Sequence, residues 1–422
     1  MSATIAIIGA TVSGNHGAEA MLATTIGRLR ESHPDARFLV YSYYAKRDRG
    51  LVARAGVEFL PSSPQHLVTV LFPFSLLAAL LKLLGLRGWV RFLPGSVRRL
   101  NEANCLVDLA GVSFIDGREI FLAFNILTIA PAILLGVPVV KFAQAMGPFD
   151  SAINRIAGRT VLSRCAHIFA RGDATQRHLQ KLGLPAAKWS RSTDVAFLMS
   201  DADALTDGGL ARAREVLRAI EGLKRTCVSV IGICPSSVVA AKRAGEYERS
   251  LAALTQRLLS QGCAVVLLPN ATRADRMDKR FNNDLPVIQS ILQLVEASDG
   301  ARLLAVNFDI HATEIRSIIA ACDLLVTSRF HAMIFALSVA TPPLVVGWSH
   351  KYEEVMEDFG LASGVMNVDE GGAIALDFAI AEALADRENR RTQIQSRLPG
   401  VFELARRQIA HIDSLITGET PR

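Results

Sequence analysis

The sequence predicts an α/β protein with two doubly wound, Rossmann-like domains. The chain has 422 residues, of which 50% are hydrophobic and 20% are charged. Two domains of similar size are expected because that length is too great for one ordinary hydrophobic core. Strand-like and helical patterns alternate along the chain, and the alternation restarts after the polar stretch Ser200–Gly209. Such alternation is typical of parallel sheets with helices on both faces.

The first domain is expected over residues 1–200. Short apolar runs predict its strands, which are Ile5–Ile8, Arg37–Tyr41, Cys105–Leu109, Val137–Phe142 and Ala166–Ala170. The stretches between them predict its helices, which are Glu19–Glu31, Ile120–Leu135, Asn154–Arg164 and Thr175–Leu182. Ligands of open α/β sheets bind outside the carboxyl ends of the strands, so polar residues just after these strands are the candidates for a site.

The second domain is expected over residues 201–372, and a helical tail over residues 373–422. The predicted strands are Cys227–Cys234, Ala264–Leu268, Leu303–Val306, Leu324–Thr327 and Pro343–Val346. The predicted helices are Tyr247–Ser260, Leu285–Ala297 and Ala312–Cys322. Two such domains facing a cleft would suit a transferase that binds two substrates.

An apolar insertion occupies residues 67–93 of the first domain. From Leu67 to Leu84 the chain is almost entirely apolar, and Lys82, Arg87 and Arg91 lie at its end. Three interpretations stay open: a buried helical hairpin, a helix pair held at a membrane surface by its basic flank, or a transmembrane helix. The uncharged part is short for the third.

The composition limits which classes of binding partner and which cellular compartment we expect. The net charge is +6 and the pI is near 9.1, which favours anionic partners such as phosphorylated substrates, acidic glycans or a membrane surface. Nucleic acid is not expected, because the basic residues are scattered and aromatic residues are few. The six cysteines form no Cys-x-x-Cys pair, and the chain starts with a strand pattern. We expect a cytoplasmic protein that can also lie at the inner face of the cytoplasmic membrane.

The most informative motif lies between the predicted strand Leu324–Thr327 and an apolar helical pattern. It contains Ser328, Arg329 and His331. Arginine offers a planar fork suited to phosphate or carboxylate, and histidine can move a proton near neutral pH. The alternative is an N-cap serine followed by a surface arginine and an ordinary histidine.

A glycine-rich loop follows the first strand. Gly14, Asn15, His16 and Glu19 lie where a backbone could approach a ligand closely at a helix N-terminus. The spacing fits neither the dinucleotide fingerprint nor the NTPase loop. We interpret the loop as one that shapes a substrate site, and a plain tight turn is the alternative.

Polar residues also follow the later strands of the first half. Gly111 and Ser113 could hold groups of an acceptor, and Asp116 could accept a proton from a hydroxyl or cap the next helix. Gln144 and Arg171 should point towards the same cleft, with Arg171 as the better candidate for binding an anion.

These motifs together resemble the polysaccharide pyruvyl transferase family over nearly the whole chain. The resemblance rests on Gly14-Asn15-His16-Gly17-Ala18-Glu19-Ala20, Gln144-Ala-Met-Gly147-Pro148-Phe149, Arg171-Gly-Asp173, Asp194-Val-Ala-Phe197-Leu198 and Ser328-Arg329-Phe330-His331-Ala332. It implies a two-domain fold similar to glycosyltransferases of the B type. It also implies transfer of a pyruvate ketal group from phosphoenolpyruvate to sugar hydroxyls, with release of phosphate and with no cofactor or metal.

The resemblance gives the motif residues roles. Arg329 would hold the phosphate or carboxylate of phosphoenolpyruvate with both arms of its fork. His331 would act as general acid and base or stabilise the leaving phosphate, and Asp116 is the third catalytic candidate. Lys351 and Arg171 would add positive charge. The expected donor- and substrate-binding set is Gly14, Asn15, His16, Glu19, Gly111, Ser113, Gln144, Arg171, Ser236, Asn270, Ser328 and Lys351.

The chain departs from the family pattern at three places. Many relatives have an aspartate where Ala18 stands, and a Pro-His pair where Pro269-Asn270 stands. Asparagine can form hydrogen bonds but cannot transfer protons. Gly111-Val-Ser113 has fewer glycines than is common.

Two other functions are considered. A nucleotide-sugar glycosyltransferase with the same fold would need an acidic residue for the donor ribose, which Glu353, Glu354 or Glu357 could supply. A non-catalytic protein that binds a glycan at the membrane surface would not need both Arg329 and His331. For the transferase, the acceptor is expected to be a sugar or a lipid-linked oligosaccharide.

Overall fold

The chain folds into two compact units. The computed structural model describes residues 2–52, 54–243, 245–278, 282–296, 301–347, 350–366 and 372–418. Unit 1 consists of Met1–Val12, Met21–Leu198 and Phe402–Arg422, and unit 2 of Ser13–Ala20 and Met199–Val401. The glycine-rich loop after the first strand therefore belongs to unit 2, together with the Ser328–His331 motif.

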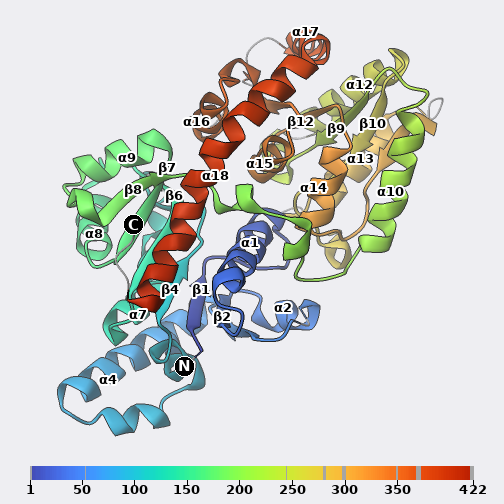
Figure 1. Ribbon diagram of the computed structural model, residues 1–422. Helices are drawn as coiled ribbons and strands as arrows, with labels where there is room; N and C mark the ends of the chain where they lie inside the picture. Colours follow the sequence, from blue (N-terminus) through green and yellow to red (C-terminus); the bar gives the residue numbers. More distant parts are fainter. Residues whose placement is uncertain are drawn as a thin grey trace. The chain divides into compact units, whose positions relative to one another are not determined.

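Unit 1 is built on an eight-stranded sheet in the order β3-β2-β1-β4-β6-β7-β8, with β5 paired to β6 (Figure 1). All of its pairings are parallel. The strands are β1 (Thr4–Ile8), β2 (Arg37–Ser42), β3 (Val57–Pro61), β4 (Cys105–Asp108), β5 (Val112–Ile115), β6 (Val139–Gly147), β7 (His167–Arg171) and β8 (Trp189–Ser192). Sequence patterns missed β3, β5 and β8. β3 and β8 are the edge strands and are partly exposed, so they lack the continuous apolar runs of central strands.

Helices connect these strands. They are α1 (His16–Ser32), α2 (Ala45–Leu51), α5 (Gly95–Asn101), α6 (Leu122–Leu127), α7 (Ala130–Leu135), α8 (Ala152–Leu162) and α9 (Gly172–Lys181). The helical stretch predicted over Ile120–Leu135 is confirmed, but it is broken into the short 3-10 helix η3 (Glu119–Phe121), α6 and α7. Pro131 lies at the start of α7, where proline favours a new helix.

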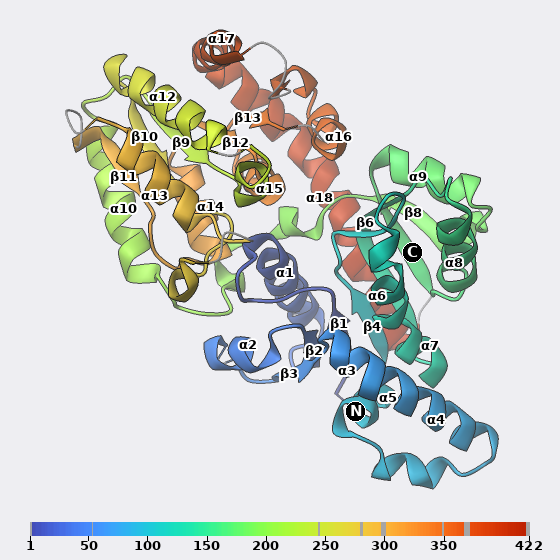
Figure 2. The same ribbon diagram turned by 180° about the vertical axis from the view of Figure 1, so that it is seen from behind.

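The apolar insertion forms a helical hairpin that extends from unit 1 (Figure 1 and Figure 2). It consists of α3 (Pro64–His66), the π-helical turn η1 (Leu67–Leu71), α4 (Phe72–Leu83) and the 3-10 helix η2 (Arg87–Phe92). Among the described residues, the helical stretch Pro64–Leu83 is long and apolar enough to cross a membrane by length and composition. The interpretation as a buried hairpin is wrong, because many of its large apolar side chains are exposed.

Unit 2 contains a six-stranded parallel sheet in the order β11-β10-β9-β12-β13-β14. The strands are β9 (Val230–Cys234), β10 (Ala264–Leu267), β11 (Leu303–Ala305), β12 (Leu324–Thr327), β13 (Pro343–Val346) and β14 (Val365–Met366). This is the strand order of a Rossmann fold, and it changes direction between β9 and β12. Sequence patterns missed only the two-residue strand β14 among these. The α/β class with two parallel sheets is confirmed.

The helices of unit 2 surround this sheet. They are α10 (Leu210–Leu223), α11 (Ser237–Ala240), α12 (Glu246–Ser260), α13 (Leu285–Leu294), α14 (Ala312–Ala320), α15 (Phe330–Ser338), α16 (His350–Asp358) and α17 (Gly372–Ala385). The long α18 (Arg387–Thr417) starts in unit 2 and ends in unit 1. α12, α13 and α17 pack with the strands around a core that includes Ile231, Val265 and Leu324.

Candidate functional site

Two predicted motifs meet at the carboxyl ends of β9 and β12 in unit 2. Ser236 follows β9, and Ser328 and Arg329 follow β12. The sheet order changes direction between these two strands, and ligands of α/β proteins bind beside such a point. The strand–helix junction predicted for the Ser328–His331 motif is confirmed, because β12 ends at Thr327 and α15 begins at Phe330.

Arg329 is held by a buried carboxylate that the sequence did not reveal. Its Nη2 donates to Asp284 and, over 2.8 Å, to Oγ of Ser237. Asp284 also accepts backbone N–H groups from Ser237, Asn270 and Ala271 at 2.9–3.0 Å. Burial alone would lower the pKa of Arg329, but the charge of Asp284 outweighs it and raises that pKa. With Nη2 engaged, Nε and Nη1 are the groups left for a ligand, so the predicted two-armed contact would require this pair to rearrange.

Ser236 and Ser328, which follow β9 and β12, are linked to each other through hydrogen bonds with Tyr247. Tyr247 donates its hydroxyl to Oγ of Ser328 at 2.9 Å and accepts the backbone N–H of Ser236 at 3.1 Å. Tyr352 donates to the backbone oxygen of Ser328 at 3.0 Å. Burial raises the pKa of the Tyr247 hydroxyl, so it stays a neutral donor. These contacts make Ser236 and Ser328 parts of a rigid frame around Arg329.

Lys351 lies beside the same motif. Its ammonium stands 5.2 Å from the ring centres of both Phe330 and Tyr352. Phe330 in turn packs edge-on against His331 at 5.4 Å. Arg329, His331 and Lys351 therefore gather at the N-terminus of α15, where the helix presents its positive end. The ammonium of Lys351 and the positive end of the helix suit an anionic ligand, while Asp284 balances the charge of Arg329.

The glycine-rich loop packs directly on this group. A β-carbon on Gly17 would lie 2.0 Å from Nδ1 of His331, and one on Gly14 would lie 2.8 Å from Nε of Arg273. The side-chain oxygen of Asn15 accepts the N–H groups of Gly17 and Ala18, and so caps α1. The glycines of this loop thus make room for side chains of unit 2.

A buried hydrogen-bonded cluster of His16, Glu19 and His311 fixes the start of α1. Oε2 of Glu19 lies 2.7 Å from Nδ1 of His16, and Oε1 lies 2.8 Å from Nδ1 of His311. Nε2 of His16 is 2.8 Å from Oγ1 of Thr272. Burial by itself would raise the pKa of Glu19, but His311 and the hydrogen bonds from both histidines lower it to about 2. Burial would lower the pKa of His311, but the charge of Glu19 outweighs it and raises that pKa.

The same three residues are a possible set of metal ligands, because their ligand atoms lie within 4.8 Å of one another. Their closest separations are 2.7 and 2.8 Å, which are hydrogen-bond distances. Ligands about 2.0–2.1 Å from a tetrahedral metal lie more than 3 Å apart. The observed spacing therefore suits shared protons, with Glu19 ionised and both imidazoles donating to it.

The predicted residues Gly111, Ser113, Gln144 and Arg171 form a second group, in unit 1. Ser113 donates to Oε1 of Gln144 at 2.7 Å, and Nε2 of Gln144 donates to the backbone oxygen of Asp108 at 2.9 Å. Nη1 of Arg171 lies 3.4 Å from Asp194 and 3.7 Å from the place of a β-carbon on Gly111. Gly111 follows β4 and Arg171 is the last residue of β7, so both lie at the carboxyl edge of the sheet. The prediction that the other two follow a strand is wrong, because Ser113 lies within β5 and Gln144 within β6.

Asp116 is engaged in capping. Its Oδ2 accepts the backbone N–H groups of Asp150 and Ser151, at the start of α8, and its Oδ1 accepts from Nδ2 of Asn154 at 2.6 Å. Asp116 therefore caps a helix, as one of the two predictions for it states. The helix is α8, however, and not the helix that follows Asp116 in the sequence. The catalytic role stays a prediction that this geometry does not favour.

Several residues of the site were missed in the sequence. They are Tyr247, Thr272, Arg273, Asp284 and His311. Asp284 and His311 each stand directly before a predicted helix, and aspartate at that position is an ordinary helix start signal. Their roles come from contacts with residues far away in the chain.

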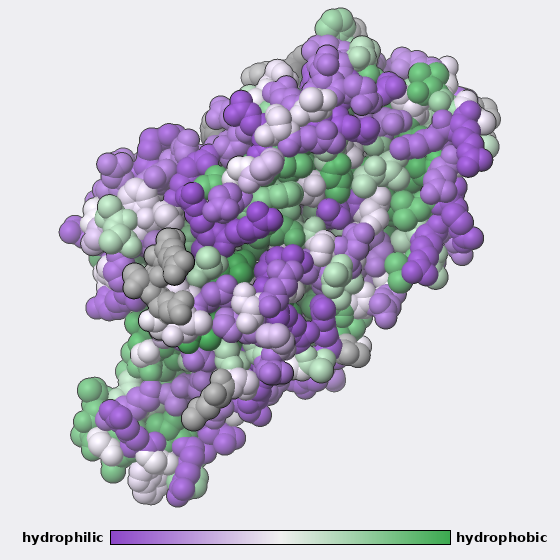
Figure 3. All heavy atoms as spheres, in the orientation of Figure 1, coloured by the Kyte–Doolittle hydropathy of each residue, from purple (hydrophilic) through white to green (hydrophobic). Residues whose placement is uncertain are grey.

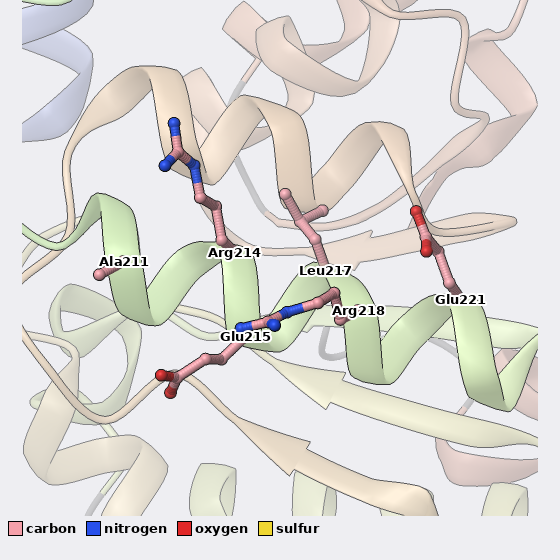
Figure 4. A pocket seen from close by; sticks show the side chains of 6 residues that line it. All are labelled: Ala211, Arg214, Glu215, Leu217, Arg218 and Glu221. Carbon is pink, nitrogen blue, oxygen red and sulfur yellow. The ribbon is translucent and has the colours of Figure 1, made fainter.

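A surface hollow lies along α10 and is lined by Ala211, Arg214, Glu215, Leu217, Arg218 and Glu221 (Figure 4). All of these side chains come from one helix. None belongs to a predicted motif, and their charges are of both signs. The hollow therefore shares no residue with the site in unit 2.

Known proteins provide an independent comparison. A family model for polysaccharide pyruvyl transferases matches residues 15–350. The amylovoran biosynthesis protein AmsJ of Erwinia amylovora is 24% identical over 282 residues, which cover 66% of this chain and 65% of that protein. The chain thus spans slightly less than two thirds of the length of this curated relative.

Solved structures show the same architecture. The S. aureus MnaA–UDP structure matches with a TM-score of 0.60, 12% identity and 99% coverage of both chains. The structure of Anabaena Alr3699/HepE with UDP and glucose matches with a TM-score of 0.53 and 14% identity, over 99% of this chain and 100% of that one. A UDP-glucose:anthocyanidin 3-O-glucosyltransferase with UDP has a TM-score of 0.57 and 11% identity, over 99% and 100%. At these identities the likeness shows the fold alone, which is similar to that of B-type glycosyltransferases, as predicted.

The family match covers most of the chain and includes both the glycine-rich loop from Asn15 onward and the Ser328–His331 motif. These are the segments that pack together in unit 2 around Arg329 and His331. The chain therefore belongs to the polysaccharide pyruvyl transferase family, a family of transferase enzymes.

Proposed function

We propose that the protein transfers a pyruvate group from phosphoenolpyruvate to two sugar hydroxyls of an exopolysaccharide or cell-envelope glycan precursor. The product would be a cyclic ketal, and phosphate would be released. The observation that supports this most is the gathering of Arg329, His331 and Lys351 at the N-terminus of α15. Phosphoenolpyruvate carries a phosphate and a carboxylate, and such a site attracts both.

The chemistry needs one proton donor and one proton acceptor. Protonation of the methylene carbon turns it into a methyl group and makes C2 electrophilic. One sugar hydroxyl then adds to C2 and gives up its proton, and the bond from C2 to the phosphate oxygen breaks. A second hydroxyl closes the ketal and releases another proton. Two protons leave the sugar, one ends on the methyl group and one on phosphate, so the reaction balances without an oxidant.

His331 is the proposed proton-transfer residue. Gly17 and Phe330 fix its ring on two sides, which would hold it in one orientation towards the donor. Nη1 of Arg329 would donate to the phosphate or carboxylate while Asp284 keeps the guanidinium in place. Lys351 would neutralise charge on the departing phosphate. Ser236, Ser328 and Asn270 would position these groups and would not take part in bond making.

The group in unit 1 is the proposed acceptor side. Ser113, Gln144 and Gly111 offer hydroxyl, amide and backbone groups that can form hydrogen bonds with sugar hydroxyls. Arg171 would bind an acidic sugar or a diphosphate that carries it. We place the reaction in the cytoplasm, which fits cysteines that are all free in the structure.

Release of inorganic phosphate from phosphoenolpyruvate, in the presence of glycan precursors, tests this proposal. A parallel assay follows nucleotide release from UDP-sugars, which a glycosyltransferase would show. We expect phosphate release in the wild type, a decrease of at least about 10²-fold in kcat for His331→Asn, and a comparable loss in kcat/KM for Arg329→Ala. Arg218→Ala, on the surface of α10, is the matched control. Nucleotide release without phosphate release would overturn the proposal, and so would full activity of His331→Asn.

A further inference from the structure

We propose that the η1–α4–η2 hairpin of unit 1 is a docking surface for the interfacial layer of an anionic lipid bilayer. The large apolar side chains exposed on it are Val68, Leu76, Leu77, Leu80, Leu83, Leu84, Leu86, Trp89 and Phe92. Leu83 is 83% exposed, Phe92 67% and Trp89 59%. Soluble proteins rarely expose so many large apolar groups side by side, and such patches mark interaction surfaces. In Figure 3 hydrophobic residues gather on this hairpin, with hydrophilic ones beside them.

The opposite face of the hairpin is anchored in the protein. Leu67, Leu71, Ser75 and Ala78 are almost completely buried, and their spacing of three to four residues places them on one face of the helix. This face packs on α7, and Lys82 donates to the backbone oxygen of Leu135 at 2.7 Å. The helix is thus apolar all round but covered on one side only, so its outer apolar face is presented on a fixed support.

Charge favours an anionic surface. Residues 64–93 contain Lys82, Arg87 and Arg91 and no aspartate or glutamate, which gives the hairpin a formal charge of +3. Arg87 and Arg91 are exposed and lie between the exposed apolar residues of η2. The guanidinium of Arg91 stands 4.8 Å from the ring centre of Phe92, and Trp89 packs against the same ring. Basic residues interleaved with tryptophan and leucine are typical of segments that lie in the plane of a bilayer interface.

The topology of unit 1 does not allow a membrane span here. β3 ends at Pro61 and β4 begins at Cys105, and both strands belong to one sheet. A chain that crossed through Pro64–Leu83 would have to cross back before β4. η2 has six residues and would span only about 12 Å, against the roughly 30 Å of a hydrocarbon core. The hairpin can therefore enter only the outer part of the bilayer.

A second copy of the chain is a less suitable occupant. Two hairpins that met face to face would bring two clusters of positive charge together with no acidic residue on either hairpin to neutralise them. Anionic lipid headgroups provide the neutralising charge, and the acyl region accepts the leucine and aromatic side chains. The bilayer satisfies both features of this surface.

The surface also continues towards the proposed acceptor side. α7 contacts α4 and also α6, and the exposed apolar residues Ile120, Phe121 and Phe124 lie on η3 and α6. This second apolar group follows β5, which carries Ser113. If the proposed function holds, docking would bring an acceptor carried on a membrane lipid close to this edge. The docking itself does not depend on that function, because its evidence lies in the hairpin alone.

Flotation of the full-length protein with lipid vesicles tests the proposal. The two vesicle types are phosphatidylethanolamine with about one third phosphatidylglycerol, and pure phosphatidylcholine, each at low and high salt. We expect binding to the anionic vesicles that weakens with salt. Arg87→Gln with Arg91→Gln should weaken partitioning roughly 30-fold, at about fivefold per charge. Leu83→Ser with Trp89→Ser should reduce it at least roughly tenfold.

The control is Val228→Ser with Phe378→Ser, which removes two apolar side chains that are equally exposed in unit 2. This variant should float like the wild type, and circular dichroism should show that all variants are folded. Wild-type protein that binds neither vesicle type overturns the proposal, and so does equal binding by the hairpin variants. Sedimentation velocity tests whether the surface binds a second copy of the chain instead. That would be the case if the wild type is a dimer that does not bind vesicles, and if Leu83→Ser with Trp89→Ser makes it a monomer.

Discussion

The imidazole ring of His331 lies against the backbone of Gly17, so closely that a β-carbon on Gly17 would come within 2.0 Å of Nδ1. Gly17 is in the first turn of α1 and His331 is in the first turn of α15. The contact therefore joins two helix N-termini, both of which present positive dipole ends. It also explains why a glycine is needed in this turn, since every other residue would displace the ring.

Gly17→Ala should impair catalysis more than folding. The new methyl group would push His331 away from its position, and a shift of about 1 Å in a catalytic group can cost about 10²-fold in rate. Steady-state kinetics with phosphoenolpyruvate would measure this loss. Gly88→Ala is the control, because a β-carbon there meets nothing within 4 Å. Unchanged kcat/KM in Gly17→Ala would show that the orientation of His331 is unimportant.

Glu19→Gln should change how stability depends on pH. The pKa of Glu19 is lowered to about 2, so its contribution is present above its ordinary value near 4.5 and is lost as the pH falls from there towards 2. The pKa of His311 is raised, so the same pairing is fully present below 6.5 and is lost as the pH rises through the raised value. Between pH 4.5 and 6.5 the pairing of Glu19 with His311 contributes most to the free energy of unfolding, about 3 kcal/mol.

Denaturant unfolding of the wild type and of Glu19→Gln across this pH range measures the difference. The two curves of unfolding free energy should converge at low pH and be furthest apart between pH 4.5 and 6.5. Glu221→Gln, on the surface of α10, is the matched control. A constant offset at every pH would mean that Glu19 acts through packing and not through its charge.

Asp284→Asn should destabilise unit 2 strongly. Asp284 is completely buried and accepts hydrogen bonds from Arg329 and from three backbone N–H groups. The variant would leave the guanidinium of Arg329 without its countercharge, which typically costs about 3–5 kcal/mol. Thermal unfolding would show the loss, with the exposed Asp207→Asn as the control. A loss below about 1 kcal/mol would mean that Arg329 finds another partner.

Arg171→Ala should affect the acceptor and not the donor. Arg171 belongs to the group in unit 1 with Gly111 and is paired with Asp194. We expect the KM for the glycan acceptor to rise by about tenfold while the KM for phosphoenolpyruvate stays the same. The exposed Arg177→Ala on α9 is the control. A rise in the KM for phosphoenolpyruvate instead would move Arg171 to the donor side.

Treatment with a chelator should leave activity unchanged. His16, Glu19 and His311 are spaced for shared protons, as the 2.7 and 2.8 Å separations show. Dialysis of the enzyme against EDTA, followed by the phosphate-release assay, tests this expectation. Loss of activity that zinc restores in the wild type but not in His311→Ala would show that the three residues bind a metal.

Local patterns were sufficient for most of the fold. β12 and β13 have the predicted bounds, and the Ser328–His331 motif lies at a strand–helix junction as expected. Apolar runs and helix start signals depend on neighbouring residues, so a single sequence contains them. The sequence patterns did not predict the edge strands β3 and β8, because a half-exposed strand needs no continuous apolar run.

The sequence by itself determined the α/β class, the two parallel sheets and the motif that carries Arg329 and His331. Only the tertiary structure decided that Glu19 meets His311, which is 292 positions away, and that Asp284 holds Arg329. It also decided that Asp116 caps α8 and that the apolar hairpin keeps one face uncovered. The physical reason is the same in each case: such contacts depend on strand order and on what packs against a surface, and neither is a property of a local stretch of chain.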